Sequence, residues 1–122
     1  MNVHVSSFSK VPIYEQIRVQ IKQNVLNNTI IQGEQLPSIR VMAKELQIGI
    51  VTVKRAYEEL EAEGIVINIP GKGCYVKYID EEKIKEINII EASKMVDEII
   101  GYANTCNISK NDIIKLVNDK WR

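Results

Sequence analysis

The chain has 122 residues, which is the size of one ordinary domain or of a small domain with an appendage. Hydrophobic residues make up 45% and charged residues 26%, as in a folded soluble protein. No apolar run is long enough to cross a bilayer, and the first residues lack the charged and apolar regions of a secretory signal. These features argue against a membrane-spanning protein, and we expect a cytoplasmic one.

Charge is unevenly distributed, although 16 basic and 16 acidic residues cancel. Residues 1–57 carry seven Lys and Arg against three Glu, whereas residues 80–122 carry seven against nine Asp and Glu. A basic N-terminal half is compatible with a polyanionic partner, because a local patch sets the electrostatic footprint. Cys74 and Cys106 do not have a metal-ligand spacing. We expect free thiols and no metal or cofactor, with a redox switch as the less favoured alternative.

Three helices are predicted before residue 64. The first spans residues 12–28, because Pro12 suits a first turn and isoleucine or valine recurs every four residues. The second begins after Ser38, a good N-cap. The third follows a three-residue turn at 47–49 and ends at about Glu63, before a glycine. Two helices joined by a short glycine-containing turn are typical of a helix-turn-helix.

A β-hairpin is predicted directly after the third helix. Residues 65–69 and 74–78 are rich in β-branched and aromatic side chains, and they flank the turn residues Pro70-Gly71-Lys72-Gly73. A hairpin in this position is a wing. The sequence therefore predicts a winged helix-turn-helix DNA-binding domain over residues 1–78.

Residues 79–122 are predicted to form two further helices. Asp80-Glu81-Glu82 places acidic residues at the positive end of a long helix that reaches about Tyr102. Ser109 and Asp112 are spaced like a capping box at the start of the last helix. The predicted fold class is α+β and mainly helical: three helices and a hairpin wing, followed by a two-helix C-terminal segment.

The C-terminal segment has a broader apolar face than two short helices can bury by themselves. Pairing with a second copy would bury it, and a two-fold homodimer matches a palindromic DNA site. The alternative is that part of this face folds back onto the first helix. The segment is small for a private ligand cavity, so we expect any effector at the dimer interface or between the two parts of the chain. The predicted dimerisation residues are Ile84, Ile87, Ile90, Val96, Ile99, Ile100, Ile113, Leu116 and Val117.

An ordered set of short motifs runs through about two-thirds of the chain: Pro12-Ile13-Tyr14-Glu15-Gln16-Ile17, Leu36-Pro37-Ser38-Ile39-Arg40, Met42-Ala43, Leu46, residues 52–61, Glu63-Gly64 and residues 71–76. In these motifs, the sequence resembles the GntR family of bacterial regulators and, within it, the short YtrA-like subfamily. Such regulators are typically homodimeric repressors, often of operons for ABC transporters, so the resemblance implies a DNA-binding transcription regulator of this kind. The two-helix tail is similar to the dimerisation segment of the subfamily.

The predicted DNA contacts come from three places. A recognition helix places its N-terminal residues in the major groove. The arginine of the Leu-Pro-Ser-x-Arg motif can bind a phosphate or a guanine, and the wing tip can approach the minor groove. The predicted set is Arg40, Ile50, Val51, Thr52, Lys54, Arg55, Gly71, Lys72 and Gly73.

Each polar candidate also has an ordinary structural alternative. Arg40 could pair with a nearby glutamate. Lys54 and Arg55 could each pair with the glutamate four residues further along the helix. For Arg55 we favour a phosphate contact. The Thr52 hydroxyl could bond the local backbone. The glycines flanking Lys72 could simply belong to a hairpin turn, although a lysine at the tip favours DNA.

The start of the third helix departs from the family pattern. Relatives usually have Ser or Asn, then Arg or Pro, then Thr or Asn, where this chain has Gly49-Ile50-Val51. We hypothesise that Ile50 and Val51 contact thymine methyl groups, which predicts an A/T-rich operator at these steps. The alternative for Ile50 is packing into the turn.

Two other classes of function are weighed against DNA recognition. A winged helix used only for protein–protein interaction would fit the zero net charge, but Arg40, Lys54 and Lys72 on the expected DNA face oppose it. A nonspecific architectural binder would be strongly basic. An enzyme is not expected, because the sequence has no nucleophile–base set, and its glycine-rich turn lacks the pattern of a phosphate-binding loop.

Overall fold

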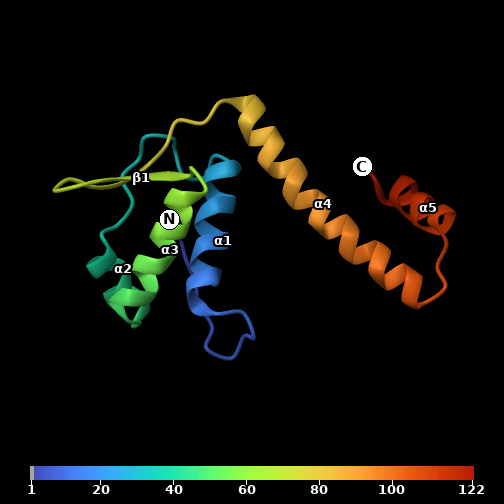
Figure 1. Cartoon of the computed structure of the whole chain (residues 1–122), viewed down its shortest axis with the longest axis horizontal. Helices are drawn as coiled ribbons and strands as arrows, with labels where there is room; N and C mark the ends of the chain where they lie inside the picture. The colour runs from blue at the N-terminus through green and yellow to red at the C-terminus, as the bar shows by residue number, and fades with distance from the viewer. Residues whose placement is uncertain (1) are drawn as a thin grey trace. The chain divides into compact units, whose positions relative to one another are not determined.

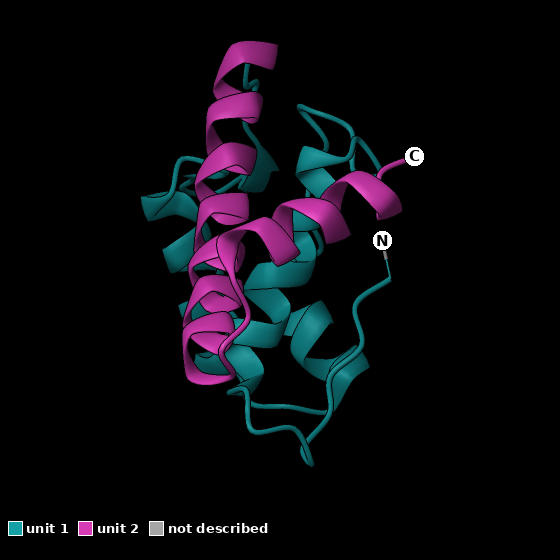
Figure 2. Cartoon of the chain, turned by 90° about the vertical axis from the view of Figure 1, so that its right-hand side faces the viewer, with its two compact units in different colours: residues 1–80 teal, residues 81–122 magenta. Residues whose placement is uncertain are grey.

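The computed structural model describes residues 2–122 and divides into two compact units, residues 1–80 and 81–122 (Figure 2). The boundary predicted from sequence lies two residues earlier. The elements are α1 (Ile13–Leu26), α2 (Ile39–Leu46), α3 (Ile50–Ala62), β1 (Val66–Ile69), β2 (Gly73–Val76), α4 (Glu81–Thr105) and α5 (Lys110–Lys120) (Figure 1).

The core of the first unit lies where α1 and α2 pack against α3. The four-residue recurrence on α1 puts Ile17, Ile21 and Val25 on one face, and all three side chains are fully buried. From α3, Val53 and Leu60 are equally buried. This packing fixes α3 against the other two helices and leaves its opposite face free for a partner.

The connection between α2 and α3 has a left-handed residue at Gln47, where φ is 56°. The Ser38 hydroxyl accepts a hydrogen bond from the backbone N–H of Val41 at 3.1 Å, so the predicted N-cap of α2 is confirmed. Gly49 is the N-cap of α3 and has an ordinary φ of −70°. The turn therefore depends on a left-handed glutamine, and the glycine does not supply the unusual backbone angle.

The wing is an antiparallel hairpin in which Val66 pairs with Val76 and Ile69 pairs with Gly73. A short segment before α2 adds a third piece to this sheet, because Gln35 forms a bridge with Tyr75. The Leu36 N–H donates to the Cys74 carbonyl at 2.8 Å, and the Val76 N–H donates to the Glu34 carbonyl at 2.9 Å. The wing is thus tied to the segment that leads into α2.

The segment before α1 lies along that helix and is held by two glutamine side chains. The backbone N–H of His4 donates to Gln20 Oε1 at 3.0 Å, and Gln20 Nε2 donates to the His4 carbonyl at 2.7 Å. Gln16 makes the same pair of bonds with Ser6, at 2.8 and 2.9 Å. The two glutamine amides lie one helical turn apart. They form hydrogen bonds with the backbone N–H and carbonyl groups of the segment, as a neighbouring strand would in a sheet.

In the second unit, α5 begins with a full capping box. The Ser109 hydroxyl accepts from the Asp112 N–H at 3.1 Å, and the Asp112 carboxylate accepts from the Ser109 N–H at 3.0 Å. Ala103 is the one buried side chain among residues 81–122. Of the predicted dimerisation residues, Ile84, Ile87 and Ile113 are half-buried. The others, Ile90, Val96, Ile99, Ile100, Leu116 and Val117, are exposed.

The predicted fold class is confirmed, with three helices, a two-stranded wing and two further helices in the predicted order. The ends of the elements differ by a few residues from the prediction; α1 is shorter at both ends, and α4 continues to Thr105. Each strand is also shorter than its apolar run. Within residues 2–122, the helices are too short or too polar for any of them to span a membrane.

Candidate nucleic-acid interface

The first turn of α3 presents two branched apolar side chains to solvent. Val51 is 79% exposed and Ile50 is 44% exposed. The exposure of Ile50 opposes the alternative that it packs into the turn. The half-buried Thr52 follows, and its hydroxyl makes no hydrogen bond to the residues that the structure describes. The local backbone bond considered for it is not formed.

Arg40 lies in the first turn of α2 and is exposed. It forms no ion pair with any residue in the described range 2–122, so the surface pairing considered as its alternative is absent. Its guanidinium is therefore free to bind an anion, and a planar guanidinium suits a phosphate or the edge of a guanine.

Lys54 and Arg55 are both paired within α3. Lys54 Nζ lies 3.8 Å from Glu58 Oε1, and Arg55 Nε lies 3.6 Å from Glu59 Oε1. The alternatives named from sequence are thus present in the free protein. Both lysine and glutamate of the first pair are about 60% exposed, and such an i,i+4 pair contributes about 0.3–0.5 kcal/mol. A phosphate can displace a pair of that strength.

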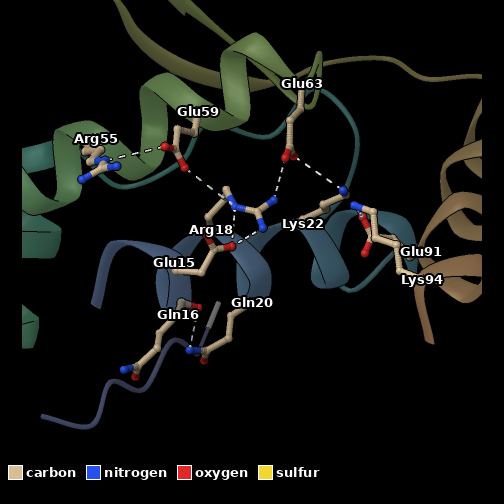
Figure 3. A network of polar contacts seen from close by, with 10 residues as sticks. All are labelled: Glu15, Gln16, Arg18, Gln20, Lys22, Arg55, Glu59, Glu63, Glu91 and Lys94. Carbon is tan, nitrogen blue, oxygen red and sulfur yellow. Dashed lines mark hydrogen bonds and ion pairs between the residues drawn. The ribbon is translucent and has the colours of Figure 1, made fainter. Parts of the chain in front are cut away.

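A network of ion pairs sets the position of α3 against α1 (Figure 3). Arg18 of α1 bonds Glu15 on its own helix, and it reaches across to Glu63 at 2.6 Å and Glu59 at 3.9 Å. Lys22 lies 3.6 Å from Glu63 as well. The Arg18 side chain is only 18% exposed, so these charges are less screened than those of an ordinary surface pair.

At the wing tip, Gly71 and Gly73 have φ angles of 76° and 125°, which favour glycine. The exposed Lys72 lies between them. Its carbonyl accepts from Gln35 Nε2 at 3.1 Å and from the Tyr75 hydroxyl at 3.3 Å. A Cβ at residue 73 would lie 2.6 Å from the same Gln35 amide. The two glycines are thus required by the turn itself, and the charge at the tip comes from the lysine.

Comparison with known proteins identifies this arrangement. The model of the gntR family of bacterial regulatory proteins matches residues 13–76, which is more than half of the chain. The chain belongs to the GntR family. The HTH-type transcriptional repressor YtrA of Bacillus subtilis is 39% identical over 74 residues, which cover 61% of this chain and 57% of YtrA. The sequence-based resemblance to the GntR family and its YtrA-like members is therefore confirmed.

Two solved structures have a similar fold. A GntR family transcriptional regulator from Listeria monocytogenes is 30% identical with a TM-score of 0.77, over 91% of this chain and 96% of that one. The DNA-binding domain of AraR, solved in complex with its operator ORE1, is 18% identical with a TM-score of 0.52. It covers 62% of this chain and 93% of that one, and its likeness is one of fold alone.

The chain matches only part of the length of its curated relatives. The chain spans between 15% and 57% of the length of three curated Bacillus subtilis regulators that it matches at 38–39% identity. The region shared with the GntR family is the winged helix-turn-helix, which contains every residue predicted to contact DNA. The GntR relatives are described as transcriptional regulators, not as enzymes.

Sequence reasoning missed the residues that support this site. Tyr14 belongs to the family motif, and nothing in the sequence indicates that its ring lies under the Arg55 guanidinium, 3.7 Å from centroid to Cζ. Gln35 was not singled out, although it joins the wing tip to the segment before α2. A cation–π contact between two helices has no fixed spacing in the sequence. A bridge of one residue is too short to show the apolar–polar alternation of a strand. The sequence therefore has no pattern that predicts either contact.

Proposed function

We propose that this chain is a transcription regulator that binds duplex DNA with its winged helix-turn-helix. The observation that carries the proposal is the set of exposed cations on the elements that such folds use for DNA: Arg40 on α2, Lys54 on α3 and Lys72 at the wing tip. The YtrA relative is described as a repressor, and the AraR domain was solved with its operator. Both descriptions support repression by operator binding. We propose that this binding takes place in the cytoplasm, where bacterial DNA lies.

Homodimerisation is the second part of the proposal. Helices α4 and α5 bury one side chain between residues 81 and 122, whereas helices in proteins owe most of their stability to the packing of an apolar face. The exposed apolar side chains of α4 and α5 would be buried by the same helices of a second copy. A two-fold dimer would present two α3 helices to a palindromic operator. From the resemblance to YtrA-like regulators, we propose an operon for an ABC transporter as the target. Any effector would bind at the dimer interface or between the two parts of the chain.

The decisive experiment is selection of bound duplexes from a random pool with the full chain, followed by a salt series on the recovered site. A palindromic site is expected, with an affinity that falls as salt rises because phosphate contacts release counterions. Arg40→Ala and Lys54→Ala should each weaken binding, whereas Lys115→Ala on α5 is the matched control. If no duplex is bound at low salt, the domain is a protein-interaction module and the proposal is wrong.

Dimerisation is tested separately by sedimentation. Val96→Asp places a charge among the exposed apolar residues of α4, and the variant should sediment as a monomer and lose most of its affinity for a palindrome. Glu98→Gln also changes the charge by one unit, but it lies on the side of α4 opposite Val96, so this variant should remain dimeric. An unaltered chain that sediments as a monomer at micromolar concentration would contradict this part.

A further inference from the structure

The Arg55 side chain is held on two sides. Its Cζ lies 3.7 Å from the centroid of the Tyr14 ring, which is a cation–π contact between the first turn of α1 and the second turn of α3. Its Nε lies 3.6 Å from Glu59 Oε1 on the next turn of α3. The Arg55 side chain is nevertheless 58% exposed.

These contacts fix the plane of the guanidinium without using all of its donors. The ring covers one face, and the carboxylate lies beside the Nε edge. The two Nη groups form no ion pair or hydrogen bond with the residues that the structure describes. Glu59 is itself 3.9 Å from Arg18, so its negative charge is shared by two cations and opposes an incoming anion less than a lone carboxylate would.

We propose that Tyr14 is a positioning residue, which holds the Arg55 guanidinium ready for one phosphate of bound DNA beside the recognition helix. The inference rests on the DNA binding proposed above and extends it to α1. A phosphate fits better than a base edge, because Arg55 lies one turn beyond the N-terminal residues of α3 that enter a groove. A planar guanidinium with two free Nη groups matches two phosphate oxygens, and stacking reduces the side-chain freedom lost on binding.

The test uses the full chain, the duplex recovered by selection, and a random duplex at low salt as the nonspecific probe. Arg55→Ala should lower the slope of log affinity against log salt by about 0.9 for each protomer bound, or about 1.8 for a homodimer on a palindrome. Arg55→Lys should keep that slope and lose affinity, because it keeps the charge and loses the plane. Tyr14→Leu should weaken binding of both duplexes about two- to fivefold for each protomer bound, whereas Tyr14→Phe keeps the ring and should bind normally.

The double variant separates positioning from structural support. Tyr14→Leu in the Arg55→Ala background should cause no further loss of affinity, since the residue that Tyr14 positions is gone. Urea unfolding of every variant measures stability independently. If Tyr14→Leu lowers stability but leaves affinity and salt slope unchanged, the contact only joins α1 to α3 and the proposal is overturned. Failure of the unaltered chain to bind either duplex would instead overturn the DNA-binding function itself.

Discussion

Replacing thymine by uracil in the operator tests how α3 recognises its sequence. The two bases pair alike and differ by the C5 methyl group, which lies in the major groove. Val51 is 79% exposed in the free protein, so nearly all of its side chain is available to cover such a methyl group. Ile50, at 44% exposed, offers a smaller surface beside it.

The magnitude follows from the apolar surface that one methyl group contributes. Burying one CH₂-sized group contributes ~0.8 kcal/mol, which is about a fourfold change in affinity. A homodimer on a palindrome would make the contact twice. Uracil at both half-sites should therefore cost about 1.6 kcal/mol, or roughly 14-fold in affinity.

The assay is competition fluorescence anisotropy on the selected duplex, with each thymine replaced in turn by deoxyuridine. One step in each half-site should respond strongly, and thymines outside the half-sites serve as controls. Val51→Ala should bind the thymine and uracil duplexes with nearly equal affinity, because the partner of the methyl group has been removed. An invariant G·C pair opposite the start of α3, or indifference to every uracil, would refute the methyl contact.

Three further predictions concern stability and thiol chemistry. Tyr57→Phe removes the 2.7 Å hydrogen bond from the Tyr57 hydroxyl to the Pro37 carbonyl and should lower the free energy of unfolding by about 1 kcal/mol; an unchanged urea midpoint would contradict this. Burial raises the pKa of Cys74 from near 9 to about 11, whereas Cys106 is exposed. Iodoacetamide at pH 8 should therefore modify Cys106 and spare Cys74, and equal modification rates would contradict this. Because the folded-state pKa is raised, the stability that Cys74 contributes should decline as the pH rises from 9 towards 11. Ser109→Ala removes the cap of α5 and should cost about 1 kcal/mol, seen as lost helicity by circular dichroism, while Ser109→Asp should retain it.

Most of the fold could be predicted because its signals are local. A four-residue recurrence of apolar side chains identified α1, and single capping residues located the starts of α2 and α5. The hairpin followed from two apolar runs around a glycine-rich turn. These features depend on residues within a few positions of one another, so the sequence displays them directly.

The features that could not be predicted depend on packing between distant segments. Gln35 joins the wing through a bridge of one residue, too short to show the alternation of a strand. Gln47 has the left-handed backbone angle of the turn, although Gly49, two residues later, is the residue type that adopts this angle most easily. The contact of Tyr14 with Arg55 requires the register of α1 against α3, which no short-range pattern contains.

Affinity and sequence preference are expected to come from different residues of this surface. Arg40, Lys54 and Lys72 carry the charges, and their phosphate contacts weaken as salt rises for every DNA sequence alike. Val51 is uncharged, and the burial of an apolar group does not release counterions. Raising the salt should therefore weaken the thymine and uracil duplexes by the same factor and leave the ratio of their affinities unchanged. A ratio that collapses with salt would mean that the charged residues, and not the exposed valine, distinguish the two sequences.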